Sequence, residues 1–567
     1  MRGLTEKIHL SVILLFFLVS ASLLAGCGAG GATPTTLPPS AVPATAAAVL
    51  PSVTPVSPSI MVDGTNGFPW WNDSVFYEIF VRSFADSNGD GIGDFNGIIQ
   101  KLDYLENLGF RGLWLMPINP SPSYHGYDVT DYYAVNPDYG SMDDFKRLLR
   151  EAHKRGIRVI MDLVINHTSD QHPWFQQARD PTSKYRDWYI WNDTDPGFAG
   201  PSGQTVWHPT SNGFYYGVFI AQMPDLNYRN LEVTQEMEKV TKFWLHLGLD
   251  GYRIDAAKQL IEEGKAQENT KSTIEWFKKF KPIYKQINPQ AMVVGEVWSN
   301  SYSAVQFVRT EGMDLVFDFD LASGWVSGAL NANADKLMGT TVNENDIFKG
   351  QQLATFLTNH DMNRVMSQMF GNVDKARAAA TVYLTSPGVP FVYYGEEIGM
   401  SGSKPDEKIR TPMQWTGGDK AGFTTGNPWE AINSDYPQVN VDIQSKAPGS
   451  IFNPYKKLIQ ARNQHEALRV GELIKVDTGS PKVYAMLRKT EKEAVLVLIN
   501  LDKEANSTYS LSLTSSTLKG SFAPQALVGE GTFSNLKLDD QGGINAYQPL
   551  ASLPPNANLV LLLKPVL

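Results

Sequence analysis

Polar and charged side chains stand at the carboxyl ends of four β-rich runs in this chain. They are Asn166 and His167 after the run 157–165, Arg253 and Asp255 in the run 251–255, Glu296 in the run 292–297, and His360 and Asp361 after the run 354–359. Because side chains alternate along a strand, Arg253 and Asp255 lie on one face. One polar strand end is often a solvated loop, but four together predict a shared site.

Three carboxyl groups in this set, those of Asp255, Glu296 and Asp361, could carry out acid–base chemistry. Cleavage of a glycosidic bond needs an acid that protonates the leaving oxygen and a carboxylate that attacks or stabilises the anomeric carbon. Retaining enzymes hold these two groups about 5–5.5 Å apart. We expect Arg253 to lower the pKa of Asp255 and an apolar setting at Trp298 to raise that of Glu296.

The elements that would position these residues alternate between strand and helix. The expected strands are 75–81, 112–116, 157–165, 251–255, 292–297, 314–318, 354–359 and 390–394, and stretches with helical spacing between them include 142–153, 233–247 and 273–287. This alternation predicts a parallel (β/α)8 barrel, in which the polar strand ends converge on one rim. A doubly wound sheet is the alternative, since counting strands does not establish closure.

Two segments depart from the alternation. The segment 167–228 is rich in Trp, Tyr, Pro, Asp and Gly without a helical period, which predicts an irregular inserted domain after the third strand, at the carboxyl rim. After a last expected helix at 451–467, the remaining chain alternates apolar and polar residues, which predicts an antiparallel β-sandwich. We therefore expect a barrel at 67–166 and 229–467, an inserted domain at 167–228 and a sandwich at 468–567.

The amino-terminal residues have the features of an export signal. Arg2 and Lys7 precede an apolar run, and 24–27 reads Leu-Ala-Gly-Cys. Cys27 is the only cysteine of the chain, so we expect a lipoprotein signal at 1–27 with lipidation at Cys27; an ordinary secretory signal or a short anchor is the alternative. Residues 28–66, rich in Ala, Pro, Thr and Ser, predict a linker. The expected location is the outer face of a membrane, at the cell surface or in the periplasm.

Composition narrows the partners. The formal net charge of −10 argues against nucleic acid, whose binding needs an excess of Lys and Arg. The chain contains 13 Trp, 23 Tyr and 27 Phe, a supply of flat apolar faces that suits sugar rings as well as core packing. We expect a monomer that acts on a glucan and reaches the membrane only through its lipid.

Four ordered segments resemble the signature regions of the α-amylase family, glycoside hydrolase family 13. They are Asp162-Leu-Val-Ile-Asn-His167, Gly251-Tyr-Arg-Ile-Asp-Ala-Ala-Lys258, Gly295-Glu-Val-Trp298 and Phe356-Leu-Thr-Asn-His-Asp361. The resemblance spans residues 70–470 and implies that Asp255 is the nucleophile, Glu296 the general acid and base, and Asp361 the carboxylate that stabilises the transition state. It also implies a set of substrate-binding residues, namely Tyr124, Tyr127, His167, Arg253, Lys258, His360 and Arg410.

A further constellation predicts calcium binding. The loop 86–94 carries oxygen ligands at alternating positions: Asp86, Asn88, Asp90, the carbonyl of Ile92, and Asp94. It departs from a full EF-hand because Gly97 stands where a bidentate Glu would be. A polar glycine-rich loop without metal is the alternative. The resemblance also matches Asn166 to a residue that ligates a different calcium in many amylases, although the sequence does not identify its partners.

The resemblance divides between two groups of the family. Met223-Pro-Asp-Leu-Asn227 resembles the group intermediate between oligo-1,6-glucosidases and neopullulanases, and Ala256 and Lys258 are typical of α-amylases. The segment 410–415, which begins with Arg410, resembles exo-acting α-glucosidases instead. Those relatives have an Asp where Tyr124 stands here, and that Asp works with the matching Arg to hold a terminal glucose. We therefore expect an α-amylase, with an exo-glucosidase, a glucanotransferase or a non-catalytic glucan-binding protein as alternatives.

Overall fold

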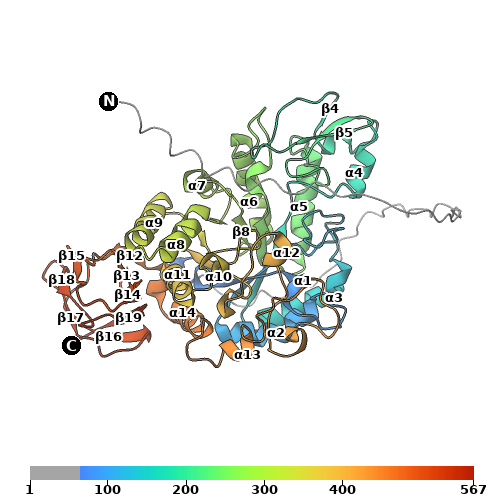
Figure 1. The fold of residues 1–567 in the computed structure, drawn as a ribbon. Coiled ribbons are helices and arrows are strands. Elements are labelled where there is room, and N and C mark those ends of the chain that lie inside the picture. Colours follow the sequence, from blue (N-terminus) through green and yellow to red (C-terminus); the bar gives the residue numbers. More distant parts are fainter. Residues whose placement is uncertain (1–63, 567) are drawn as a thin grey trace, which may run out of the picture. The chain divides into compact units, whose positions relative to one another are not determined.

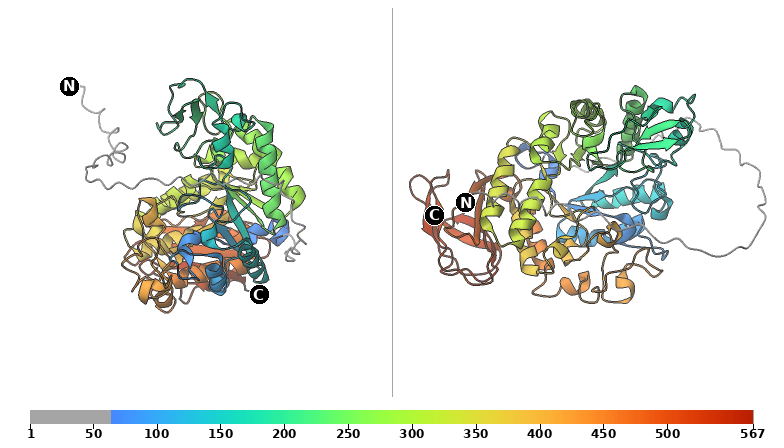
Figure 2. Two further views of the ribbon diagram at one scale, coloured as in Figure 1. Left: turned by 90° about the vertical axis from the view of Figure 1, so that its right-hand side faces the viewer. Right: turned by 45° about the horizontal axis from the view of Figure 1, so that its top comes forward.

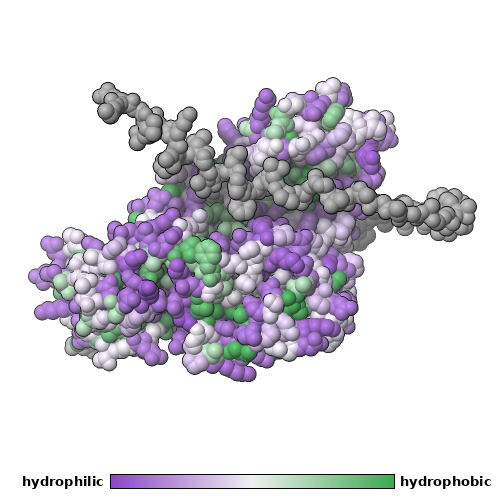
Figure 3. All heavy atoms as spheres, viewed as in Figure 1, coloured by the Kyte–Doolittle hydropathy of each residue, from purple (hydrophilic) through white to green (hydrophobic). Residues whose placement is uncertain are grey.

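The computed structural model describes residues 64–566 of the chain. The expected signal at 1–27, its Cys27 and most of the expected linker at 28–66 lie outside these residues. Within 64–566, no helix combines the length and the apolar character needed to cross a bilayer. On the face shown in Figure 3, hydrophilic residues predominate and hydrophobic ones form separate small groups.

A parallel sheet closed into a barrel occupies the centre of the described residues (Figures 1 and 2). Its strands are β1 (Phe76–Ile79), β2 (Gly112–Leu115), β3 (Arg158–Leu163), β7 (Gly251–Ile254), β8 (Met292–Gly295), β9 (Leu315–Val316), β10 (Ala354–Thr355) and β11 (Val389–Tyr393). They pair in the order β10-β11-β1-β2-β3-β7-β8-β9. A parallel bridge between Phe317 and Ala354 joins the two ends of this order. The predicted barrel is therefore confirmed, and the doubly wound alternative is excluded.

Alternation along the strands divides the core into two layers. The inward side chains, among them Phe76, Trp114 and Phe391, form a cluster inside the barrel. Phe76 stacks on Phe391 at 4.5 Å between ring centroids, and Gly112 gives this ring its space, since a Cβ there would lie 2.3 Å from Phe76. The outward side chains, such as Tyr77 and Leu113, pack in the larger core that includes the surrounding helices.

Most of the helices surround the barrel (Figures 1 and 2), whereas α4 lies in the segment between β3 and β7. They are α1 (Val81–Phe84), α2 (Phe95–Leu108), α3 (Met142–Lys154), α4 (Pro173–Ala178), α5 (Leu231–His246), α6 (Lys271–Ile287), α7 (Ser301–Arg309), α8 (Phe319–Leu330), α9 (Ala334–Ile347), α10 (Val365–Gln368), α11 (Val373–Thr385), α12 (Asp406–Ile409), α13 (Val441–Gln444), α14 (Phe452–Gln464) and α15 (Glu466–Val470). The last expected helix is divided into α14 and α15 because His465 is extended and contacts Glu493 Oε2 through Nδ1 at 3.0 Å.

The chain between β3 and β7 contains a small antiparallel sheet in the order β4 (Trp191–Asn192), β6 (Gly213–Tyr216) and β5 (Trp207–Thr210). After α15 the chain forms antiparallel strands, which are β12 (Glu472–Lys475), β13 (Val483–Lys489), β14 (Ala494–Asn500), β15 (Leu511–Leu513), β16 (Ser521–Val528), β17 (Leu536–Lys537), β18 (Ile544–Tyr547) and β19 (Asn558–Pro565). They form one sheet in the order β12-β13-β14-β19-β16-β17 and a second sheet of β15 and β18. Buried Arg488 connects this domain to the helices by donating to the carbonyls of Thr385 and Gly471.

Candidate active site

The predicted carboxyl groups lie just beyond the strands that position them. β7 ends at Ile254 and β8 at Gly295, so Asp255 and Glu296 are the first residues after their strands, whereas Asp361 follows β10 on a longer loop. The strands are thus shorter than the sequence predicts, because the backbone leaves the sheet at the rim. Ala256 turns there into the left-handed region, at φ 48°, and its N–H donates to Glu296 Oε2 at 3.0 Å.

Arg253 connects the acidic side chains. Its Nη1 lies 2.6 Å from Asp162 Oδ1 and 2.7 Å from Asp255 Oδ1, and its Nη2 lies 2.9 Å from Glu296 Oε2. Asp162 also accepts hydrogen bonds from Trp114 Nε1 and the Tyr127 hydroxyl, at 3.1 and 3.2 Å. Asp162 is the first residue of the first signature segment, but its position in the sequence predicts no role. In the structure it holds the guanidinium in place between the other two carboxylates.

The electrostatic setting of Asp255 and Glu296 differs in part from the prediction. Burial raises the pKa of Asp255 to about 6, although Arg253 opposes this effect. Burial also raises the pKa of Glu296, again against Arg253, and the neighbouring Asp255 and Asp361 raise it further. Arg253 therefore moderates both carboxyl groups instead of favouring one. Trp298 is 44% exposed and stacks on Phe319, so burial of the carboxyl group, and not Trp298 alone, raises the pKa of Glu296.

His360 lies within a row of charged groups. Its Nδ1 is 2.5 Å from Glu78 Oε1, and its Nε2 is 3.0 Å from Asp361 Oδ2 and 2.6 Å from the Tyr127 hydroxyl. Burial disfavours the imidazolium, but Asp361 and Glu78 outweigh it and raise the pKa of His360 to about 10. Burial would raise the pKa of Asp361, yet the charges of His360 and Arg410 hold it well below its usual range. Asp361 is therefore ionised next to a cationic histidine.

Glu78 is the member of this row that sequence reasoning missed. It lies in the centre of β1, in the run Phe-Tyr-Glu-Ile, and is 1% exposed. A carboxylate in a fully buried strand must be paired, since an isolated buried charge is very costly. That single acidic residue in an otherwise uncharged run was the available signal.

Arg410 lies beside the same loop. Its Nη2 contacts Asp361 Oδ1 at 2.8 Å and Asp406 Oδ2 at 3.2 Å, and its Nε donates to the carbonyl of His360 at 2.9 Å. Tyr124 is half-buried, with its ring stacked on Trp429 at 5.2 Å and the Arg410 guanidinium 6.0 Å from its centroid. Burial raises the pKa of Tyr124 to about 12, so its hydroxyl is neutral. Predicted Tyr124 and Arg410 are thus neighbours at the site.

The other predicted binding residues occupy different positions around the carboxyl groups. His167 is buried and donates from Nε2 to the carbonyl of Tyr127 at 3.0 Å, and burial lowers its pKa to about 4. Tyr127 stacks on His360 at 5.5 Å. Lys258 pairs with Glu268 at 2.6 Å and lines an open pocket of about 340 Å³. The other lining residues of this pocket are Ser202, Phe219, Ala256, Gln259, Glu296 and Trp298. Glu296 therefore faces a space that a sugar unit can enter.

The predicted calcium loop has suitable oxygen atoms, and several of them accept hydrogen bonds from backbone N–H groups of the loop. Asp86 Oδ1 accepts from the N–H groups of Asn88 and Gly89, and Asp90 Oδ1 accepts from that of Ile92. Asp94 is buried and caps α2 by accepting from Gly97. In the described part of the chain, no group of three or more His, Cys, Asp or Glu side chains could hold a metal ion. The oxygen types fit a hard cation, and Asn88 and the carbonyl of Ile92 would add ligands that are not carboxylates.

Asn166 has a neighbour that the sequence analysis did not identify. Its Oδ1 and the Oδ2 of Asp225 are both buried and lack a hydrogen-bond partner among the described residues. Burial raises the pKa of Asp225 well above its usual value, and the nearby Glu262 raises it further, while a hydrogen bond from Asn166 lowers it. Two unpaired buried oxygens of this kind could coordinate a cation.

Comparisons with known proteins agree with this geometry. Residues 78–471 match the model of the alpha amylase catalytic domain. The chain is 42% identical to Alpha-amylase 3 of Dictyoglomus thermophilum, over 77% of this chain and 87% of that protein. It is 34% identical to an oligo-1,6-glucosidase of Parageobacillus thermoglucosidasius, over 77% and 91% of the two chains.

A solved structure gives the same result. The crystal structure of an alpha-amylase from H. orenii superposes with a TM-score of 0.76 at 38% identity, covering 87% of this chain and 99% of that one. Together with the residues gathered at the barrel rim, these similarities identify the chain as a glycosidase of the α-amylase family.

Proposed function

We propose that this enzyme hydrolyses α-1,4-glucosidic bonds within starch, glycogen and maltooligosaccharides, with retention of configuration. The observation that carries the proposal is the pair Asp255 and Glu296 on the two Nη atoms of Arg253, with Glu296 facing the open pocket. A retaining glycosidase needs a nucleophile and an acid that flank the scissile bond, about 5–5.5 Å apart.

Each carboxyl group has a distinct part in the proposed reaction. Glu296, whose pKa burial raises, protonates the leaving oxygen while Asp255 attacks the anomeric carbon. This step forms a glycosyl-enzyme and releases the first product. Glu296 then removes a proton from water, which displaces Asp255 and gives an α-configured product. Asp361, held ionised by His360 and Arg410, stabilises the oxocarbenium-like transition state.

Two observations favour attack within chains over removal of terminal glucose. Tyr124 is an uncharged ring stacked on Trp429, so it cannot form the charged clamp of exo-acting relatives. Arg410, the other half of that clamp, is ion-paired with Asp361 and Asp406. An α-glucosidase or oligo-1,6-glucosidase is the second candidate, because Arg410 is present and a 34% identical relative has that activity in its name.

Transfer to a sugar hydroxyl differs from hydrolysis only in the acceptor, so a glucanotransferase would use the same residues. A non-catalytic glucan-binding protein is disfavoured, because such a protein has no need of three carboxyl groups arranged around Arg253 and His360.

We also propose, from the sequence alone, that the enzyme is an exported monomer anchored through Cys27. The residue types of the loop 86–94 support a further proposal, that the enzyme binds calcium there.

Product analysis tests the proposed function. Wild-type enzyme is incubated with soluble starch, maltotriose, pullulan and a cyclodextrin, and Asp255→Asn and Glu296→Gln serve as isosteric inactive controls. We expect α-configured maltooligosaccharides from starch and none from either control. Starch hydrolysis at the wild-type rate by Asp255→Asn would overturn the assignment, and disproportionation of maltotriose without net hydrolysis would instead identify a transferase.

Incorporation of radiolabelled palmitate tests the proposed lipid anchor. We expect the wild type to incorporate the label and Cys27→Ser to lose it.

A further inference from the structure

A second pocket lies between the inserted segment and the chain that follows η5 (Ala257–Gln259). Its volume is about 390 Å³, within the range of about 300–1,000 Å³ that is usual for small-molecule sites. One wall comes from β4, β5 and β6 of the inserted segment, and the facing wall comes from residues 260–264. No lining residue is shared with the pocket beside Glu296.

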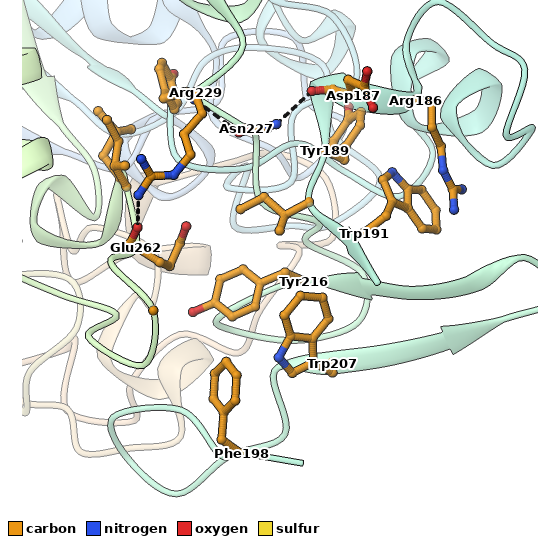
Figure 4. A pocket seen from close by; sticks show the side chains of 15 residues that line it. Arg186, Asp187, Tyr189, Trp191, Phe198, Trp207, Tyr216, Asn227, Arg229 and Glu262 are labelled. Atoms are coloured by element: carbon orange, nitrogen blue, oxygen red, sulfur yellow. Dashed lines mark hydrogen bonds between the residues drawn. The ribbon is translucent and has the colours of Figure 1, made fainter. Parts of the chain in front are cut away.

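Aromatic rings form the wall on the inserted segment. Figure 4 shows Phe198, Trp207 and Tyr216 grouped together on one side of the pocket. Trp207 lies 5.3 Å from Tyr216 and 6.1 Å from Phe198 between ring centroids, with Phe198 nearly perpendicular to it. Trp191 is held in place by the Arg186 guanidinium, 3.5 Å from its ring centroid. The pocket thus presents rigid apolar faces before any ligand binds.

Polar groups of both charge signs border the same space. The cations are Arg186 and Arg229, and the acids are Asp187 and Glu262. Arg229 donates to the backbone carbonyl of Glu262, which fixes the facing wall (Figure 4). A phosphate would meet the carboxylate of Asp187, and a cation would meet two guanidinium groups. A neutral ligand rich in hydroxyl groups is the better match.

The indole groups add an unmet hydrogen-bonding capacity. The Nε1 atoms of Trp191 and Trp207 are buried and have no hydrogen-bond partner among the described residues. Trp207 is 9% exposed, so this donor belongs to a side chain that is nine-tenths buried at the pocket wall. Because buried donors are nearly always paired, these atoms indicate a wall suited to an oxygen-bearing ligand.

We propose that this pocket is a second binding site for a glucosyl unit of an α-glucan. Sugar rings combine C–H faces that pack on aromatic rings with hydroxyls that bond to carboxylate and guanidinium groups, which are the two features of this pocket. The choice of α-glucan rests on the proposed function. Lys258 and Gln259 line the catalytic pocket, whereas Leu260 and Ile261, the next residues, line this one. A polymer held here raises the local concentration of glucan at the cleft.

Calorimetric titration of the inactive Glu296→Gln enzyme with maltotriose tests the proposal. We expect two binding events. Adding Phe198→Ala should weaken one of them about tenfold by removing an aromatic face, and should leave the other unchanged. Adding the isosteric Glu262→Gln should weaken the same event about tenfold at pH 8, because burial raises the pKa of Glu262 to about 7 and the carboxyl group is then a charged acceptor. The matched control is Phe370→Ala, which removes an aromatic ring that is 85% exposed elsewhere.

The retained event reports that each variant is folded. A single event, identical in the Glu296→Gln parent and in both pocket variants, would overturn the second site and leave the proposed function intact. A single event in the Glu296→Gln parent that both pocket variants weaken would mean that maltotriose binds the second pocket and not the catalytic pocket. That result would count against the proposed function instead. A crystal of Glu296→Gln soaked in maltotriose should show a sugar ring beside Phe198 and Trp207, and an empty pocket at a concentration that fills the cleft would also overturn the proposal.

Discussion

Nη2 of Arg410 lies 2.8 Å from Oδ1 of Asp361, so the arginine associated with terminal-glucose binding in exo-acting relatives is ion-paired here with a candidate catalytic carboxylate. The same side chain donates from Nε to the carbonyl of His360. Arg410 therefore fixes both the charge and the backbone of the loop after β10. We propose that Arg410 is a positioning residue for Asp361.

Arg410→Lys should lower kcat on starch about 10- to 150-fold, because an ammonium group cannot reproduce the contacts of a planar guanidinium with three partners. KM should change less, since the substrate pocket beside Glu296 is untouched. Steady-state kinetics check this, with Arg377→Lys as the control, because the partners of Arg377 are Asp374 and the carbonyl of Gly449, neither of which belongs to the site. An equal, small effect of the two substitutions on kcat would contradict the role.

The pKa of Asp255 predicts the acid limb of the pH profile. Asp255 must be ionised to attack, and its pKa in the folded enzyme is raised to about 6. Activity should thus be low below pH 6 and should rise as the pH increases through about 6. At higher pH, activity should fall again when Glu296 loses the proton that it must donate. Because the groups interact, the profile reports macroscopic values. kcat/KM for maltotriose measured from pH 4 to 10 checks this, and an acid limb centred near the ordinary value for Asp, about 4, would refute it.

Glu78→Gln should add a second loss of activity on the alkaline side, caused by deprotonation of His360, to the loss that Glu296 sets. The amide can still accept from Nδ1 of His360, but one of the two carboxylates that raise the pKa of this histidine to about 10 is lost. The imidazolium should then lose its proton at lower pH, and with it the charge that holds Asp361. Near pH 6, activity should approach that of the wild type. A uniform loss of activity at every pH would show that Glu78 has only a structural role.

The sequence could predict those site residues whose role follows from their position at the end of a predicted strand. Asp255 and Glu296 each lie at the end of a buried run, so the barrel rim could be predicted before any contact was known. The pairing of Glu78 with His360 could not, because 282 residues separate them and only barrel closure brings them together. The partners of Arg410 and Asn166 depend in the same way on how loops from different strands pack.

Calcium at the loop 86–94 should appear as a stabilisation that chelation removes, because a ligand bound only by the native state favours that state by mass action. Asp86 also accepts hydrogen bonds within the loop, so its removal alone can destabilise the fold. The informative quantity is therefore the difference in Tm between calcium and chelator within each variant. In the wild type, we expect a higher Tm in calcium than in chelator. In the double variant Asp86→Asn/Asp90→Asn, we expect the two Tm values to be equal.

A difference in Tm that persists in this double variant, and disappears on adding Asp225→Asn, would place the calcium at Asn166 and Asp225 instead. If the wild type has the same Tm in calcium and in chelator, then calcium binding at neither position stabilises the folded enzyme. Asp180→Asn, at an exposed turn outside both positions, is the matched control.

Chain-end selectivity should depend on Tyr124. Its neutral ring, stacked on Trp429 and 6.0 Å from the Arg410 guanidinium, can pack against a sugar but supplies no charged acceptor for a terminal hydroxyl. A charge-assisted hydrogen bond is worth about 1.5–3 kcal/mol, a roughly 10- to 150-fold effect on binding. Early products from starch should therefore be a spread of short α-configured maltooligosaccharides, with iodine colour falling faster than reducing ends accumulate.

Tyr124→Asp should move the products toward glucose, because it places a carboxylate beside Arg410, where exo-acting relatives have one. Tyr124→Phe is the control; it keeps the ring and should keep the wild-type product spread. Chromatography of products at low conversion measures the glucose fraction in all three enzymes. Glucose as the sole early product of the wild type would show that the site already recognises chain ends without a carboxylate at position 124.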